Sequence, residues 1–533
     1  MHGIRTLQDT GPGRSSQAGQ ATVGRAHSGA RRSLYCAIIM LVTLTTGCAT
    51  VGPDYQPPAQ PARDAYRVHD ATAGDQHADA ADTAEAIPQQ VFVRAEQVRS
   101  DWYTLFGSSE LDTLIRQAIA DSPTLAAGRA RIQAARELVQ QHKGALYPQI
   151  GVNGGFSRNR VTGAEAGAAD SSQTNVFNLY QARATASYNL DLFGKTRRLI
   201  ERSNAQLNEQ QYDVLNTYVT LINNVVATAI TEAGLNAAIE TTGQIADNQA
   251  HGLEILRRQI QYGIATRADA TQIQTQLART KASLEPLRKQ KALAVNRLAV
   301  LVGKAPGLFS DPDFTLEQLQ LPQKLPVSVP GRLVKQRPDI LAAAAAVHAA
   351  SAQIGVASAN MLPDLQISGA YGRAGLSLSD LGNPAYALYS LGASLSAPLF
   401  EGGRLRAAKR QARDLYQAAR SDYRATMLTA FGEVANSLRS LEADARTLQA
   451  QRKALDAART NLHSVRARLH GGATDYLDLY TAQSQFQEAE LDFLKARVIR
   501  YRDTADLFRA LGGGWSDSAS PTHVPVSSVV RSG

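Results

Sequence analysis

Two aspartates that follow glycine turns are the side chains in this sequence whose type and position suggest a function. Asp269 lies in the segment YGIATRADATQIQ, which begins at Tyr262, and Asp478 lies in GGATDYLDLYTAQ, which begins at Gly471. Each segment leads from a glycine turn into a helical pattern, so each carboxylate can accept hydrogen bonds from the free amides of a first helical turn. Helix capping is therefore the simplest role for both residues.

A cysteine near the N-terminus is the third candidate. Residues 1–47 contain arginines and then an apolar core, and they end in LTTG directly before Cys48. This order resembles a bacterial lipoprotein signal, in which lipid is attached to the cysteine before cleavage. Thr45 departs from that pattern, which usually has leucine there, so an ordinary signal peptide with an incidental cysteine is the alternative. Apart from a covalent lipid on Cys48, no cofactor is expected.

Residue patterns of enzymes and metal sites are weak in this sequence. Gly194 to Thr196 has the end of a phosphate-binding loop, but Asn189 occupies the position of its first glycine. None of the ten histidines forms an HExxH pair. His463 and His470 could share a helix face, but solvated or packed histidines explain them more simply than a metal site. We therefore expect neither an enzyme nor a metal site.

The composition excludes some partners. The chain of 533 residues has a formal net charge of +9, but residues 1–47 hold five arginines against a single aspartate. The remaining excess is spread over the rest of the chain, and aromatic residues make up only 6%. No nucleic-acid partner is expected, because neither a basic patch nor a base-stacking surface is indicated.

A membrane span, if the chain has one, must be built from strands. The apolar run Leu34–Thr46 is too short to cross a bilayer as a helix and is typical of a signal-peptide core. Residues 180–192 and 389–399 instead alternate apolar and polar side chains with a period of two. Each stretch predicts a strand with one apolar face, long enough to cross a bilayer at a tilt.

The chain repeats one order of elements: helix, strand, loop, strand, long helix, glycine turn and returning helix. In the first half the predicted helices and loop are 123–148, 158–178, 197–261 and 267–302. In the second half they are 338–363, 373–387, 404–469 and 476–511. Each long helix of about 65 residues would be on the order of 100 Å long. The order indicates an internal duplication.

Six parts of the chain are expected. They are the leader and signal peptide 1–47, the N-terminal arm 48–100, the first repeat 101–303, the connector 304–337, the second repeat 338–515 and a C-terminal tail 516–533.

The strand count predicts an assembly. Four strands are too few to close a barrel, for which about eight is the usual minimum. Open strand edges in lipid would leave backbone groups unsatisfied at several kcal/mol each. Several chains must therefore share one barrel, with the long helices extending from it.

Several phrases occur in an order that resembles the TolC-like outer-membrane factor family, in its NodT-type efflux branch. They are CATVGPDYQPP from Cys48, LAVLVGKAPG from Leu298, VKQRPDI from Val334, APLFEGGR from Ala397 and LGGGW from Leu511. The resemblance implies an α+β fold, in which a homotrimer forms a twelve-stranded barrel in the outer membrane of a Gram-negative bacterium above a periplasmic helical tunnel. It implies a passive exit duct for small molecules, delivered by an inner-membrane pump through a periplasmic adaptor.

The resemblance also assigns roles to the two tips. The periplasmic gate would comprise Asp269 in the first half and Leu477 and Asp478 in the second, because three copies of an aspartate around one axis form a negative ring. Thr481 departs from the family, in which a further aspartate is common there. The adaptor would dock on the tip turns, at Gly263, Thr266, Gly471, Gly472 and Thr474.

Two alternatives remain open at this point. A lipid-anchored periplasmic adaptor protein is also rich in helical hairpins, but it would not carry two amphipathic strand pairs. A fibrous coiled-coil surface protein would need sustained heptads and would not explain the duplication. The exported substrate cannot be inferred from the sequence.

Overall fold

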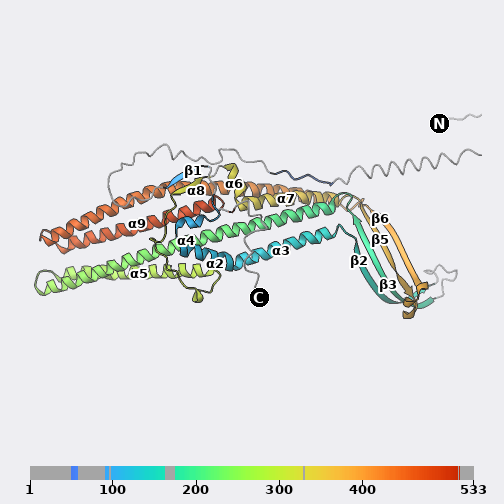
Figure 1. The fold of residues 1–533 in the computed structure, drawn as a ribbon, viewed down its shortest axis with the longest axis horizontal. Helices are drawn as coiled ribbons and strands as arrows, with labels where there is room; N and C mark the ends of the chain where they lie inside the picture. The colour runs from blue at the N-terminus through green and yellow to red at the C-terminus, as the bar shows by residue number, and fades with distance from the viewer. Residues whose placement is uncertain are drawn as a thin grey trace, which may run out of the picture.

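The computed structural model describes residues 50–57, 90–94, 98–162, 174–327, 330–513 and 515. Cys48, the leader, most of the arm and the tail 516–533 lie outside the described residues. Within them the chain forms a long bundle of helices with a sheet at one end (Figure 1). The predicted α+β fold is confirmed.

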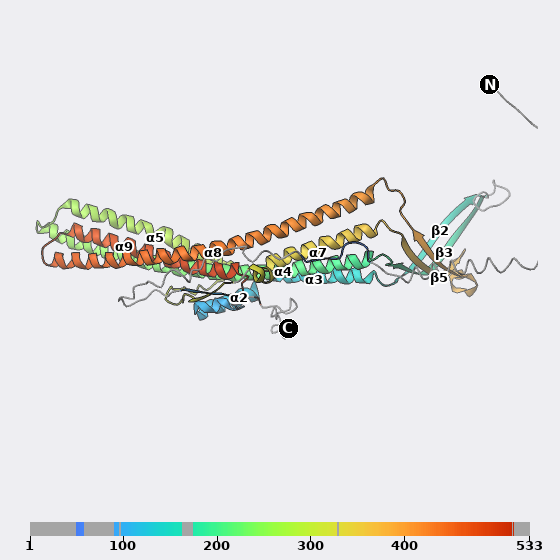
Figure 2. The same ribbon diagram turned by 90° about the horizontal axis from the view of Figure 1, so that it is seen from above.

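Two helices run most of the length of the bundle. They are α4, Lys195–Gln261, and α8, Arg404–His470, and each has 67 residues. The returning helices α5, Arg267–Leu301, and α9, Tyr476–Ala510, lie along the half that is farther from the sheet (Figure 2). These four helices agree with the sequence within a few residues at each end.

Three shorter helices complete the body. The predicted helices α3, Pro123–Gly144, and α7, Pro338–Ala359, pack against α4 on the side of the sheet. Helix α2, Ser109–Asp121, was not predicted. It buries one face against α4, and the Ser108 side chain caps it by accepting a hydrogen bond from the Leu111 amide.

Four antiparallel strands form the sheet in the order β2-β3-β5-β6. They are β2, Gln149–Thr162, β3, Thr174–Leu190, β5, Asp364–Gly375, and β6, Ala387–Ser396. The register aligns the apolar side chains in rows, for example Val152, Ala184, Tyr371 and Tyr389. One apolar face therefore runs across all four strands, as the alternation predicts.

The strands end earlier than the alternation suggests. The pattern continues to Leu192 and Leu399, whereas β3 ends at Leu190 and β6 at Ser396. After β3, the Asp191 carboxylate accepts hydrogen bonds from the amides of Thr196 and Arg197, and so starts helix α4. After β6, Pro398 has no amide hydrogen to donate to a neighbouring strand.

The middle of the bundle carries a small second sheet. Strand β1, Val91–Arg94, belongs to the arm and pairs in parallel with β4, Lys324–Val327, of the connector. Three further short elements are η1, Trp102–Phe106, η2, Pro306–Leu308, and α6, Pro330–Gln336. Leu325 of β4 is fully buried in the main hydrophobic core, in which Trp102 stacks on Phe508 at 5.0 Å between ring centroids.

A buried arginine joins two of the phrases that carry the family resemblance. Arg337, in VKQRPDI, donates to the Ala510 carbonyl at 2.9 Å and pairs with Asp339 at 2.6 Å. The Trp515 indole of LGGGW donates to the Gln336 carbonyl at 2.6 Å. These hydrogen bonds join the C-terminal end of α9 to the start of α7.

Two of these helices contain apolar stretches that would be long enough to cross a membrane. They are α4 and α7, and more than half of each stretch is buried inside the chain. Their hydropathy is that of helices packed in a protein core. The sequence pattern singles out only the apolar run near the N-terminus as a possible membrane helix.

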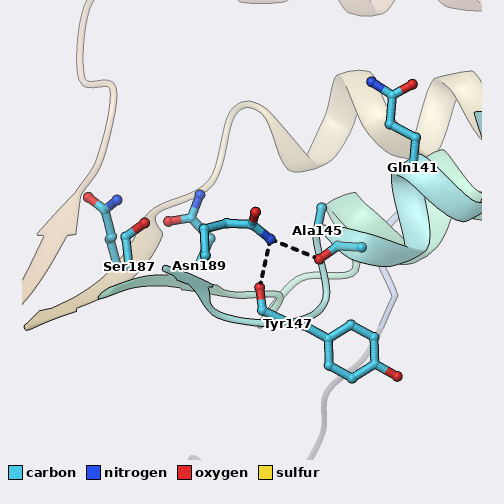
Figure 3. Close-up of a pocket in the computed structure, with 8 residues that line it drawn as sticks. Gln141, Ala145, Tyr147, Ser187 and Asn189 are labelled. Atoms are coloured by element: carbon cyan, nitrogen blue, oxygen red, sulfur yellow. Dashed lines mark hydrogen bonds between the residues drawn. The ribbon is translucent and has the colours of Figure 1, made fainter. Parts of the chain in front are cut away.

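The sheet meets the helices at a polar junction. A pocket of about 280 Å³ lies between the end of α3 and the strands, with Gln141, Tyr147, Ser187 and Asn189 among its lining (Figure 3). The side-chain amide of Gln149 donates to the carbonyls of Gly144 and Tyr147, at 3.1 and 3.2 Å. The first of these hydrogen bonds satisfies a free carbonyl at the end of α3.

Candidate functional site: the helical tips

The two tip turns have the same backbone. Gly263 and Gly472 both have a positive φ, of 74° and 70°. The amide that follows each glycine donates back over five residues, from Ile264 to the Gln259 carbonyl and from Ala473 to the Arg468 carbonyl. This is the Schellman pattern that closes a helix with glycine, and it supports the alignment of the two halves.

At the first tip, Asp269 is part of a reciprocal cap. Its amide donates to Thr266 Oγ1 at 3.3 Å, and its Oδ2 accepts the Thr266 amide at 2.9 Å and the Thr266 hydroxyl at 2.7 Å. These hydrogen bonds to Thr266, the hydroxyl first, lower the pKa of Asp269. The carboxylate is exposed, but the start of α5 uses it.

At the second tip, Asp475 occupies the N-cap position that Thr266 holds at the first tip. Asp475 caps α9 by accepting the Asp478 amide at 3.0 Å. The Asp478 carboxylate is exposed, and among the described residues it accepts a hydrogen bond only from the Thr474 hydroxyl. Asp478 therefore has an exposed carboxylate at a helix N-terminus that the helix cap does not use.

The other predicted gate residues also face solvent in the single chain. The Leu477 side chain is 51% exposed, and its carbonyl accepts the Thr481 hydroxyl at 2.9 Å. Thr481 thus spends its hydroxyl on its own helix. Leu477, Asp478 and Thr481 lie in the first turns of α9, whereas Asp269 lies at the start of α5.

Contacts between the two hairpins hold the tips together. The side-chain amide of Gln259 on α4 donates to the Tyr476 hydroxyl on α9 at 2.9 Å. Tyr480 packs with Leu253, Leu256 and Ile273. Burial, with the neighbouring Tyr476 second, raises the pKa of Tyr480 to about 12, so this phenol is neutral at physiological pH. Neither tyrosine was predicted as part of the tips.

The segment after Cys48 has a docking site that the sequence did not predict. The Val51 amide donates to the Phe193 carbonyl at 3.1 Å, next to the end of β3. Gly52, with a φ of 104°, lies so close to Gly355 of α7 that a Cβ there would be 2.5 Å from its Cα. The chain direction at this point requires glycine.

Charged and aromatic contacts fix the same segment. Arg198 on α4 is buried, and it pairs with Asp54 and with Glu201, both at 2.7 Å. The Tyr55 ring stacks on His348 at 4.1 Å between centroids, and His348 Nε2 lies 3.0 Å from a Glu201 oxygen. Residues 50–55 are therefore held at the junction between sheet and helices.

Comparison with known proteins agrees with this architecture. A family model described as outer membrane efflux protein matches residues 114–304 and 329–513. The pyoverdine export outer membrane protein OpmQ of Pseudomonas aeruginosa is 27% identical over 416 residues, which cover 78% of this chain and 87% of OpmQ. The cation efflux system protein CusC of Escherichia coli is 25% identical over 475 residues, 88% of this chain and 96% of CusC.

A solved structure gives the same result. The outer-membrane channel OprN superposes with a TM-score of 0.78 and 26% identity, over 88% of this chain and all of that chain. The proteins that match are channels and efflux components rather than enzymes.

Proposed function

The chain belongs to the outer membrane efflux protein family, and from this premise we propose that three copies close one barrel of twelve strands. Its function is that of an outer-membrane channel of a tripartite efflux system, through which small molecules leave the cell. The alternative of a periplasmic adaptor is wrong, because the match to the channel family spans both halves of the chain.

The observation that carries the trimer is the state of the sheet. It has four strands, and the outer edges of β2 and β6 have no partner among the described residues. Its apolar face is bare: Val152 is 81% exposed and Leu391 is 83% exposed. Lipid on this face and a neighbouring chain at each edge would satisfy both needs.

The helices indicate where neighbouring chains meet. Among the described residues, α4 leaves no large apolar side chain exposed, since α3, α5, α7 and α9 pack around it. Helix α8 packs mainly against α7 and α9, and it leaves Leu415 and Leu428 more than half exposed. We assign the exposed surface of α8 to contact with the next chain of the trimer.

The proposed gate is based on the carboxylate of Asp478, which the helix cap does not use. In a trimer, three copies of Asp478 would surround one axis at the end of the tunnel, next to the exposed Leu477 and Thr481. Three negative charges repel one another and attract cations, which makes a constriction that protonation or a partner can relax. Asp269, which the sequence also suggested for the gate, contributes mainly by holding the start of α5.

The tips are the proposed docking surface for the periplasmic adaptor and its inner-membrane pump. Gly263, Thr266, Gly471 and Gly472 are exposed there, and Thr474 is partly exposed. Tyr262 and Ile264 add apolar surface beside Gly263, and Tyr262 is 80% exposed. An apolar residue at a turn that packs on nothing in its own chain is suited to a partner.

The docked segment supports lipid attachment at Cys48. Thr50 lies against Gly194, at the boundary between sheet and helices. Cys48 precedes Thr50 by two residues, and two extended residues span at most about 7 Å. A lipid on its sulfur would therefore enter the leaflet on the side of the helices, and the pairing of Arg198 with Asp54 would hold it there.

The cargo is proposed only as a class. OpmQ is named for pyoverdine export and CusC for cations, yet both resemble this chain to a similar degree. Such different cargoes in one fold favour a duct with little selectivity, in which the inner-membrane pump chooses the substrate.

The trimer is tested with a matched pair of variants on adjacent residues. Leu391→Asp places a carboxylate on the apolar face of β6, and Ser390→Asp places one on the opposite face. We expect wild type and Ser390→Asp to sediment with the outer membrane and to run as trimers in mild detergent. Leu391→Asp should fail to assemble, because only its charge faces lipid. Equal assembly of the two variants, or a wild-type monomer, would refute the proposal.

A further inference from the structure

A fully buried carboxylate lies at the middle of the bundle, far from the tips. Glu232 on α4 has 0% exposure, and neither of its carboxylate oxygens has a hydrogen-bond partner in the described part of the chain. An ionised carboxylate without a donor is costly in a core. Neither gating, docking nor barrel closure uses this residue.

Two further carboxylates from the connector face it. One oxygen each from Glu232, Asp311 and Asp313 lie within 4.8 Å of one another. Because Glu232 lies far from the two aspartates in the sequence, spacing along the chain did not reveal the cluster. The expectation of no metal site was based on that spacing.

The connector holds its two aspartates in a fixed geometry. Asp313 has a φ of 55°, in the left-handed region, and its amide donates to Asp311 Oδ1 at 3.0 Å. Asn236, one turn after Glu232 on α4, donates to Asp313 Oδ1 at 3.0 Å and to the Phe314 carbonyl at 2.8 Å. The strained residue is thus tied to the helix that carries the buried carboxylate.

The charges around the cluster do not balance. Lys291 on α5 is the one cation paired with it in the described residues, at 2.6 Å from Asp313 Oδ1. Three carboxylates and one ammonium leave a net charge of −2 when all are ionised, which one divalent cation would neutralise.

We propose that Glu232, Asp311 and Asp313 bind a hard divalent cation, of which Ca²⁺ is the test case. The donors are all carboxylate oxygens, the ligands that Ca²⁺ and Mg²⁺ prefer. Asp313 is exposed, so water can complete the coordination from outside. The cation would fasten the connector to α4. This site is independent of the gate and of the trimer proposal.

The test is calorimetric titration of the purified full-length protein, stripped with a chelator, with CaCl₂ and then with MgCl₂. We expect one Ca²⁺ per chain, with a Kd on the order of 10⁻⁴ to 10⁻³ M, as in extracellular calcium modules. Glu232→Gln should abolish this binding. Glu240→Gln, an exposed position two turns further along the same helix, is the matched control and should bind as wild type does.

Thermal unfolding keeps the test decisive if a variant folds differently. Ca²⁺ should raise the Tm of wild type and of Glu240→Gln, but not that of Glu232→Gln or Asp311→Asn. Without Ca²⁺, Glu232→Gln should melt no lower than wild type, because the amide has almost the same size and places no charge in the core. No Ca²⁺ binding at millimolar concentration, or binding that survives in Glu232→Gln, would overturn the proposal.

Discussion

The two tips of this chain share a turn and differ in their caps. Both close with a glycine at positive φ and both place an aspartate in the first turn of the returning helix. At the first tip that aspartate, Asp269, is consumed by a reciprocal cap with Thr266. At the second tip Asp475 does the capping and leaves Asp478 with a single hydroxyl donor. The two copies of this element thus share a backbone conformation, but only in the second copy is the aspartate carboxylate free of the helix cap.

This difference separates fold from function within one motif. The glycine and the N-cap must be present at both tips for the chain to turn. The charge at the third helical position is needed for capping at only one of them. Asp478, whose carboxylate the local fold does not require, is therefore the better candidate for the gate of the trimer.

The largest effect is expected from the glycines, which should behave alike. Gly263→Ala and Gly472→Ala have space for the added Cβ, but positive φ should cost about 1–2 kcal/mol of local stability each. Hydrogen exchange of the tip amides should accelerate accordingly. Gly243→Ala and Gly432→Ala, inside the long helices, are the controls and should not accelerate it. Unequal effects at the two tips would break the structural equivalence.

The N-caps should also behave alike, with a smaller effect. Thr266→Ala and Asp475→Ala each remove the acceptor for an amide in the first turn, at about 1 kcal/mol. Exchange of the first-turn amides of α5 and α9 should rise roughly fivefold in the respective variants. A loss at one tip only would mean that the caps are not equivalent.

The third helical position is where the tips should part. Asp269→Ala removes the acceptor of the Thr266 amide and should speed exchange at the start of α5. Asp478→Ala removes only the contact with Thr474 and should leave the start of α9 protected. Equal acceleration in both variants would show that Asp478 caps its helix too, and the contrast would fail.

Acid should weaken the first tip with the smallest effect. Hydrogen bonds from Thr266 hold the pKa of Asp269 below its usual range. A lowered pKa stabilises the folded tip above the unfolded value of about 3.9, and this stability is lost as the pH falls through the folded pKa. Exchange at the start of α5, corrected for intrinsic rates, should be flat from pH 7 to 5 and rise below pH 4. Asp269→Asn should remove this dependence.

Local patterns predicted much of this structure. The strands, the long helices and the glycine turns each follow from a period or a turn residue within one stretch, and the register of β3 with β5 preserves the predicted apolar face. The duplication then places equivalent residues at equivalent ends. Even the candidate gate was found this way, because Asp269 and Asp478 follow the same turn.

Contacts between distant segments were not predictable. The pairing of β1 with β4, the docking of Asp54 on Arg198 and the cluster around Glu232 each join residues that no local pattern relates. The different hydrogen bonds of Asp269 and Asp478 also became clear only in the structure. Their difference depends on the residue three positions earlier. The Asp269 amide donates to the hydroxyl oxygen of Thr266, whereas the Asp478 amide donates to a carboxylate oxygen of Asp475.

Single-channel conductance in planar bilayers tests the central claim most directly, because a pore forms only if several chains close a barrel. We predict that wild type conducts poorly, that Asp478→Ala conducts clearly more, and that Asp269→Ala stays close to wild type. An unchanged conductance in Asp478→Ala, or an equal rise in both variants, would contradict the assignment of the gate to the second tip.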